Sequence, residues 1–106
     1  MADCLFCSIV AEEIPADIVL SNDDVVAFRD IAPEAPVHVL VVPRDHHANV
    51  GELASAAPAT TATLLQAAQE VAADEGVGDA YRVVFNTGAG AGQTVFHVHA
   101  HVVGGR

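Results

Sequence analysis

Three histidines near the end of the chain, His97, His99 and His101, alternate with apolar residues. The pattern of residues 95–103 predicts a β-strand, in which side chains point to opposite faces with a period of two. The three imidazoles should therefore share one face, with successive Cα atoms about 6.5 to 7 Å apart. Such a row could surround one phosphate group or one metal ion, whereas half-exposed histidines on an amphipathic strand would explain only one or two of them. The opposite face is expected to carry Phe96, Val98, Ala100 and Val102.

An aromatic ring and a carboxylate form a second candidate group. Residues 18–29 predict a β-hairpin, because two β-prone runs flank the turn-forming residues 22–24. On its second strand Val26, Phe28 and Asp30 share a face. Such a ring and carboxylate could cover a base and accept hydrogen bonds from ribose hydroxyls. A core phenylalanine beside a strand-end aspartate is the simpler interpretation of the spacing alone.

A fourth histidine, His38, lies in an almost unbroken β-branched run, residues 37–43. This pattern is typical of a central strand that is covered on both faces. The two prolines of residues 33–36 indicate a loop before it. A lone histidine on an apolar strand is usually a satisfied core residue. His46 and His47 follow in a polar loop, where spacing alone predicts solvated side chains.

Cys4 and Cys7 form a Cys-x-x-Cys motif in a stretch that suits a short helix or turn. A redox dithiol would need a strand-loop-helix context of the thioredoxin kind, which is absent from the pattern. Two other interpretations stay open. The cysteines could pack as small hydrophobes, or they could form half of a zinc site, because this spacing is common among zinc ligands and spare histidines exist elsewhere.

One long helix is predicted from Ala54 to Gly76. Apolar residues recur along it at 3.6-residue spacing, and its broad apolar surface suits both packing on a sheet and contact with a second protomer. With a further strand at residues 81–86 and a short N-terminal helix, the pattern predicts an α+β fold, in which an antiparallel five-stranded sheet carries the long helix on one face. The apolar stripe consists of Leu64, Ala67, Ala68, Val71 and Ala72.

A glycine-rich loop, residues 87–94, separates the last two predicted strands. Because a strand and not a helix follows it, the loop is weak evidence for a dinucleotide-binding fold. Its glycines, Gly92 among them, would let the backbone approach a ligand closely. Neutral donors for phosphate oxygens are offered by Asn86, Gln93 and Thr94.

The length and the net charge of the chain limit the functional classes that are possible. A chain of 106 residues predicts a single domain, 1–106, whose modest core would gain from pairing with a second copy. The hydrophobic fraction of 52% without an apolar run near 18 residues predicts a soluble protein. No secretory signal is visible, so a cytoplasmic location is expected.

The net charge of −10 would repel a nucleic acid polymer, although neutral histidines, hydroxyls and backbone N–H groups could bind one phosphate of a mononucleotide. All four basic residues are arginines and alanine is abundant, which indicates a GC-rich bacterial genome.

The motif His-x-His-x-His-x-x at residues 97–103, with apolar x, resembles the signature of the histidine triad (HIT) superfamily of nucleotide hydrolases and transferases. Read with residues 92–96 before it and Gly104-Gly105-Arg106 after it, the motif is similar to the Hint branch. The resemblance covers nearly the whole chain and implies a homodimer whose sheets continue across the interface. It also implies hydrolysis of adenosine 5'-phosphoramidates or related adenosine monophosphate derivatives through a nucleotidyl-histidine intermediate.

The resemblance implies a role for each candidate residue. His99 would be the nucleophile, His101 and His38 would share protons with the phosphate and the leaving group, and Asp30 would hold the ribose. His97 completes the triad. A structural zinc ion is expected on Cys4, Cys7, His46 and His97. The base pocket is expected to consist of Leu5, Phe6, Phe28 and Ile31, and charge on the phosphate is expected to be stabilised by Asn86, Gln93 and Thr94.

Two interpretations from other functional classes stay open. The site could bind a purine nucleotide in a sensor or scaffold, with turnover incidental. Alternatively, the histidine row could bind a catalytic metal ion, since His-x-His on a strand is also a zinc arrangement. Members of the Hint branch usually continue past Gly-Gly-Arg into a tail with Trp-Pro-Pro, whereas this chain stops at Arg106. In relatives that tail lies near the leaving-group side of the site, so the resemblance implies less about amine selectivity for this chain.

Overall fold

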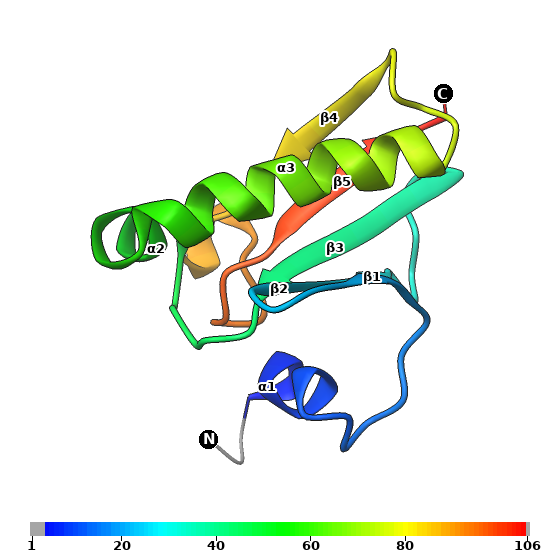
Figure 1. Cartoon of the computed structure of the whole chain (residues 1–106). Helices are drawn as coiled ribbons and strands as arrows, with labels where there is room; N and C mark the ends of the chain where they lie inside the picture. The colour runs from blue at the N-terminus through cyan, green and yellow to red at the C-terminus, as the bar shows by residue number, and fades with distance from the viewer. Residues whose placement is uncertain (1–3, 106) are drawn as a thin grey trace.

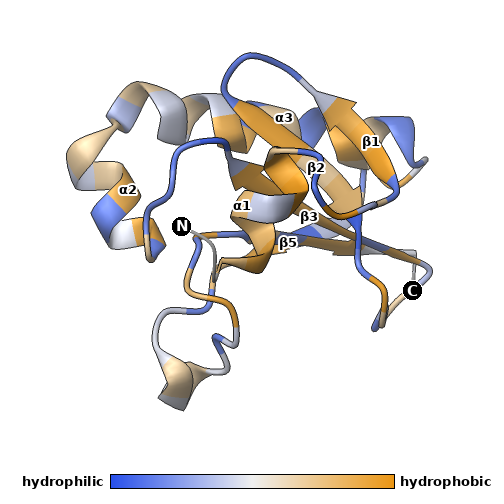
Figure 2. Ribbon diagram, turned by 90° about the horizontal axis from the view of Figure 1, so that it is seen from below, coloured by the Kyte–Doolittle hydropathy of each residue, from blue (hydrophilic) through white to orange (hydrophobic). Residues whose placement is uncertain are grey.

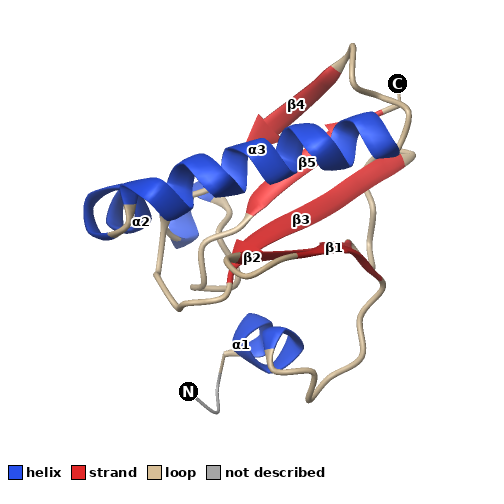
Figure 3. Cartoon of the chain, viewed as in Figure 1, coloured by secondary structure: helices blue, strands red, loops and turns tan. Residues whose placement is uncertain are grey.

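Five strands form one antiparallel sheet in the order β1-β2-β3-β5-β4 (Figure 1). The computed structural model describes residues 4–105. This architecture confirms the predicted α+β class with its long helix on one face (Figure 3). The elements along the chain are α1 (Leu5–Val10), β1 (Ile18–Ser21), β2 (Val25–Arg29), β3 (Val37–Pro43), α2 (Val50–Ala56), α3 (Pro58–Asp74), β4 (Tyr81–Val84), the short 3-10 helix η1 (Ala89–Ala91) and β5 (Ala100–Gly104).

The sheet separates two apolar layers, because alternate residues of its strands face α3 and α1. On β2, Val25 and Ala27 pack in the layer under α3, whereas Val26 and Phe28 pack with α1. All seven residues of β3 are buried, as expected for a central strand covered on both faces. In Figure 2 the strands are coloured as mainly hydrophobic and the connecting loops as largely hydrophilic. The face toward α1 is the one that carries the histidines.

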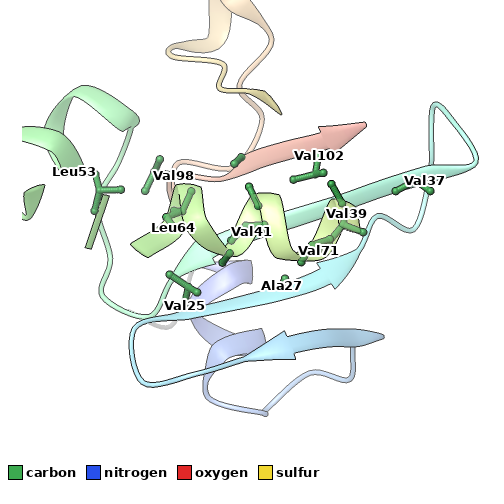
Figure 4. Packing of buried hydrophobic residues seen from close by; sticks show 14 residues of the cluster. Val25, Ala27, Val37, Val39, Val41, Leu53, Leu64, Val71, Val98 and Val102 are labelled. Atoms are coloured by element: carbon green, nitrogen blue, oxygen red, sulfur yellow. The ribbon is translucent and has the colours of Figure 1, made fainter. Parts of the chain in front are cut away.

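Helix α3 covers the other face with the predicted apolar stripe. Leu64 and Val71 point from the helix toward Val39, Val41 and other strand residues, as Figure 4 shows. Burial of this layer supplies most of the driving force that holds the sheet in register. All five stripe residues are buried: Leu64, Ala67, Ala68, Val71 and Ala72.

The helical region between β3 and β4 differs from the prediction of one helix from Ala54 to Gly76. The chain forms α2 and then α3, because Pro58 occupies the first turn of a new helix. Asn49 caps α2, since its side-chain oxygen accepts a hydrogen bond from the backbone N–H of Glu52 at 2.9 Å. Within residues 4–105, no helix has the length and hydropathy that a membrane crossing requires.

The predicted strand at residues 95–103 is shorter in the structure, where regular pairing begins only at Ala100. Residues before it form bends, and Phe96 is 51% exposed, so its expected place on the buried face is wrong. The alternation itself persists, because Val98 packs in the layer under α3, whereas His97 and His99 contact Phe6 of α1. The predicted strand at residues 81–86 likewise ends early, at Val84.

Candidate active site

A cavity of about 620 Å³ lies between α1 and the histidine-bearing face of the sheet. Its size falls within the range of sites that hold small ligands, about 300 to 1,000 Å³. His99 and His101 line it together with apolar side chains from α1 and from β2. The walls are formed by Leu5, Phe6, Ile9, Ile14, Pro15, Ala16, Asp17, Phe28, Arg29, Asp30, Ile31, Leu40, Thr94 and Val95.

His99 is buried and held in one orientation. Its Nδ1 lies 2.9 Å from the backbone carbonyl oxygen of His97, and because a carbonyl can only accept, the neutral imidazole carries its proton on Nδ1. The edge of the Phe6 ring supports the imidazole, with ring centroids 5.0 Å apart. The lone pair of His99 is therefore on Nε2, the form that a nitrogen nucleophile requires.

His38 and His101 form a hydrogen-bonded pair beside His99. The backbone N–H of Glu34 donates to Nδ1 of His38 at 3.0 Å, so neutral His38 carries its proton on Nε2. That nitrogen lies 2.9 Å from Nδ1 of His101 and 3.4 Å from a carboxylate oxygen of Asp30. His101 then accepts through Nδ1 and keeps its own proton on Nε2. In this arrangement the N–H group of His101 at Nε2 is free to donate a hydrogen bond.

The charge state of His101 is set by its surroundings. Burial lowers the pKa of His101 below its ordinary value, and the neighbouring His99 and His38 add to this effect because each would repel a second positive charge. Asp30 acts in the opposite direction, but more weakly. The imidazole of His101 is therefore mainly neutral at pH 7. Once protonated, it is a stronger acid than an ordinary histidine and can give that proton to a leaving group that develops negative charge.

Four side chains near the start of the chain and the end of β3 form a separate cluster. Cys4, Cys7, His46 and His97 each direct one ligand atom inward, and these atoms all lie within 4.8 Å of one another. Burial, together with a hydrogen bond from the Cys7 thiol to Cys4, raises the pKa of that thiol to about 11. Burial also lowers the pKa of His97, which keeps that imidazole neutral.

The donor set and spacing of this cluster fit a tetrahedral zinc ion. Nδ1 of His97 lies 3.3 Å from Sγ of Cys4 and 3.4 Å from Sγ of Cys7, and Nδ1 of His46 lies 3.4 Å from Sγ of Cys7. Zinc bonds of about 2.3 Å to sulfur and about 2.0 to 2.1 Å to nitrogen set these atoms about 3.6 Å apart. His97 also donates from Nε2 to the carbonyl of Pro43 at 2.8 Å, which leaves the lone pair of Nδ1 facing the thiols.

The three histidines of the motif therefore do not converge on one ion. Both ring nitrogens of His97 are engaged, one by the cysteines and the other by Pro43. The rings of His99 and His101 lie close together, with centroids 4.9 Å apart, and both face the large cavity. The expectation that one metal ion could sit within the whole row is wrong, because the row is divided between two sites.

Most of the residues expected to bind nucleotide line the large cavity, but three of them do not. Asn86 lines a smaller cavity on the far side of His101. Gln93 is buried, and its amide donates to the carbonyls of Ala48 and Val95 while its oxygen accepts from Gly88. Its side chain therefore holds the loop and does not face phosphate, which corrects the expected role. Gly92 adopts a left-handed conformation at the end of η1 and lines neither cavity.

Several wall residues of the cavity were not expected from the sequence. Leu40 could have been found, because it follows His38 by two residues on β3 and so shares its face. The segment that connects α1 to β1 gave no signal, since its contribution depends on how α1 is placed over the sheet. That segment supplies Ile14, Pro15, Ala16 and Asp17.

Comparisons with known proteins identify the family of this chain. The HIT domain family matches residues 11–106. An uncharacterized HIT-like protein of Synechococcus elongatus is 48% identical over 104 residues, which cover 98% of this chain and 91% of that protein. The purine nucleoside phosphoramidase of Escherichia coli (strain K12) is 38% identical over 105 residues, covering 98% of this chain and 88% of that protein. The crystal structure of a HIT family hydrolase from Legionella pneumophila has a TM-score of 0.94 at 42% identity, covering 98% of this chain and 94% of that chain. The chain belongs to the HIT domain family.

Proposed function

We propose that the protein is a hydrolase that cleaves purine nucleoside 5'-phosphoramidates, or closely related adenosine monophosphate derivatives, through a nucleotidyl-histidine intermediate. The observation that carries the proposal is the fixed orientation of His99, whose Nδ1 donates to the His97 carbonyl while Nε2 keeps its lone pair beside a cavity of about 620 Å³. The similarity to the phosphoramidase of Escherichia coli supports the same reaction class.

In the proposed first step, Nε2 of His99 attacks the α-phosphorus and forms a P–N bond. The bond from phosphorus to the leaving amine breaks, and its electron pair stays on the amine nitrogen. That nitrogen takes a proton from Nε2 of His101, which enters the step as the imidazolium and leaves it as the neutral ring. His38, which hydrogen-bonds His101 at 2.9 Å, stabilises the charge distribution during this transfer. Water then attacks the same phosphorus and gives a proton to the neutral His101. The nucleoside monophosphate is released, His99 regains the lone pair on Nε2, and His101 is again the imidazolium.

The walls of the cavity are suited to the nucleoside part of the substrate. Phe6 and Phe28 pack edge to face, with ring centroids 5.4 Å apart, and together with Leu5 offer an apolar surface to a base. Asp30 accepts from the backbone N–H of Ala32 at 2.8 Å, which orients its carboxylate at the edge of the cavity for a ribose hydroxyl. Thr94 is the predicted phosphate donor that lines this same cavity.

We also propose that Cys4, Cys7, His46 and His97 hold a structural zinc ion. When bound, zinc would keep both thiols deprotonated and tie the start of α1 to the chain around His46 and His97. The cluster would not contact the substrate and would act on the active site through His97. His97 contributes a ring nitrogen to the cluster and a carbonyl oxygen to His99, so the position of this one residue serves both sites.

Turnover tests the proposed reaction against its alternatives. We expect the protein to hydrolyse adenosine 5'-phosphoramidate and lysyl-adenylate faster than diadenosine polyphosphates, measured as kcat/KM for each substrate. Binding of adenosine monophosphate without hydrolysis of any of these substrates would instead favour a nucleotide sensor or scaffold.

A catalytic metal ion is the second candidate, because ligand atoms of Asp30, His38 and His101 also lie within 4.8 Å of one another. Activity that survives exhaustive chelation would remove that candidate.

We further propose that the protein acts as a homodimer. The strand β4 lies at an edge of the sheet and offers unpaired backbone groups to a second sheet, and Leu65 on α3 is 48% exposed. Light scattering at micromolar concentration should give twice the mass of the chain, and Leu65→Gln should shift the equilibrium toward monomer. A monomer mass for the unmodified protein would contradict this proposal.

A further inference from the structure

A second, smaller cavity adjoins the nucleotide cavity at His101. Its volume is about 210 Å³, and His101 lines both cavities, whereas His99 lines only the larger one. This volume is about one third of the 620 Å³ of the larger cavity. The smaller cavity therefore suits a compact group better than a second nucleoside. Its other walls are formed by Glu34, His38, Arg82, Val84, Asn86 and Val103.

The register of the sheet places Arg82 on the same face as the catalytic histidines. Arg82 is paired with Val103 on β5, and Val103 is paired with His38 on β3. Directly paired residues of neighbouring strands point to the same face. The next row on this face contains His101, between Val84 and Leu40. Arg82 is exposed on the edge strand and lines the cavity that His101 shares.

Arg82 differs from the other two arginines in the described part of the chain. Arg29 is paired with the carboxylates of Asp17 and Glu75, and Arg44 donates to oxygen atoms at the end of β1 and in the turn after it. Arg82 forms no ion pair or hydrogen bond with any residue from 4 to 105. In a protein with a net charge of −10, an arginine that lines a cavity and forms none of these pairs is well suited to bind an anionic group.

We propose that this smaller cavity is a leaving-group subsite, in which Arg82 selects phosphoramidates whose departing amine carries a carboxylate. The inference depends on the proposed function. When the P–N bond breaks, the amine nitrogen keeps the electron pair and takes the proton of His101, so the rest of the amine lies next to His101 on the side away from His99. That side is the smaller cavity. Asn86 offers amide N–H groups there. Glu34 also lines the cavity, and because its carboxylate would repel an anion, the carboxylate of the amine is expected on the side of Arg82 and Asn86.

The test compares two adenosine 5'-phosphoramidates whose leaving amines are β-alanine, which carries a carboxylate, and β-alaninamide, which is neutral. The two amines differ in basicity, so the informative quantity is the ratio of their kcat/KM values in the unmodified protein divided by the same ratio in Arg82→Gln. Basicity affects both proteins equally and cancels in this comparison. We expect the preference for the carboxylate substrate to fall about tenfold in Arg82→Gln, with little change for the neutral substrate, because one charge-assisted interaction is lost.

Two further variants sharpen the result. Arg82→Lys should retain part of the preference, because it keeps the charge but not the planar pair of donors. Arg44→Gln removes an equal charge away from the cavity and should leave the ratio unchanged. If Arg82→Gln hydrolyses both substrates with the unmodified ratio, the subsite proposal is wrong while the proposed function stands. If the unmodified protein hydrolyses neither substrate, the proposed function is wrong and the subsite falls with it.

Discussion

Replacing His99 with glycine should lower turnover of an adenosine phosphoramidate by about 10³-fold or more, the scale expected when a covalent catalyst is deleted. The walls that would hold the base and the ribose, including Phe28 and Asp30, do not depend on the imidazole of His99. Affinity for adenosine monophosphate should therefore stay within a few-fold of the unmodified value. A fluorogenic adenosine phosphoramidate and titration calorimetry measure the two quantities separately.

The neighbouring histidines provide matched comparisons. His101→Ala and His38→Ala should each lower turnover less, on the order of 10- to 10³-fold, because water or the remaining imidazole can partly replace a proton donor. The two effects should not add, since His38 acts through its hydrogen bond to His101 at 2.9 Å. Turnover near the unmodified rate in His99→Gly would show that the histidine row binds phosphate without attacking it, and the covalent mechanism would be wrong.

The face on which each histidine lies could be predicted from the sequence, because the period of two is a property of extended backbone and not only of paired strands. Val98 and Ala100 are buried under α3 although regular pairing begins only at Ala100. The division of the row into two sites could not be predicted in this way. It depends on the placement of α1, which brings Cys4 and Cys7 against His97 and leaves His99 facing the cavity.

The tautomers of the site depend on backbone groups, which side-chain patterns do not reveal. The carbonyl of Pro43 fixes His97 and the carbonyl of His97 fixes His99, whereas the backbone N–H of Glu34 fixes His38. Each of these contacts follows from the path of the chain in three dimensions. The sequence pattern does not indicate which carbonyl lies beside His99, and the structure assigns it to His97.

Some of the other differences could have been predicted from the sequence. Asn49 and Glu52 have the spacing of a capping box, which predicts the start of α2. In the structure Glu52 accepts from the backbone N–H of Ala48 at 3.0 Å, one residue before the usual partner. Gln93 gave no comparable signal, because a glutamine in a glycine-rich loop can serve a ligand or the loop itself. Three hydrogen bonds to backbone atoms of the protein assign it to the loop.

Loss of the proposed zinc ion should affect substrate binding more than chemistry. The cysteines belong to the start of α1, and α1 supplies Leu5, Phe6 and Ile9 to the wall of the large cavity. The reacting groups, His99 and His101, are held by the sheet and by backbone contacts. We therefore expect KM for an adenosine phosphoramidate to rise about tenfold on loss of the metal, while kcat falls by a smaller factor.

Adjacent histidines allow this expectation to be tested without disturbing the core. His46 belongs to the cluster and its side chain is exposed, so His46→Ala should fold, whereas His47→Ala removes a neighbouring imidazole that lies outside the cluster. Elemental analysis of protein purified without added metal should give about one zinc per chain for the unmodified protein and for His47→Ala, and well below one for His46→Ala.

The free energy of unfolding should fall in His46→Ala alone. The expected loss is about 4 kcal/mol when the free zinc concentration is about 1,000 times the dissociation constant of the site. Zinc well below one per chain in the unmodified protein would mean that Cys4, Cys7, His46 and His97 stabilise the start of α1 through sulfur–imidazole hydrogen bonds alone.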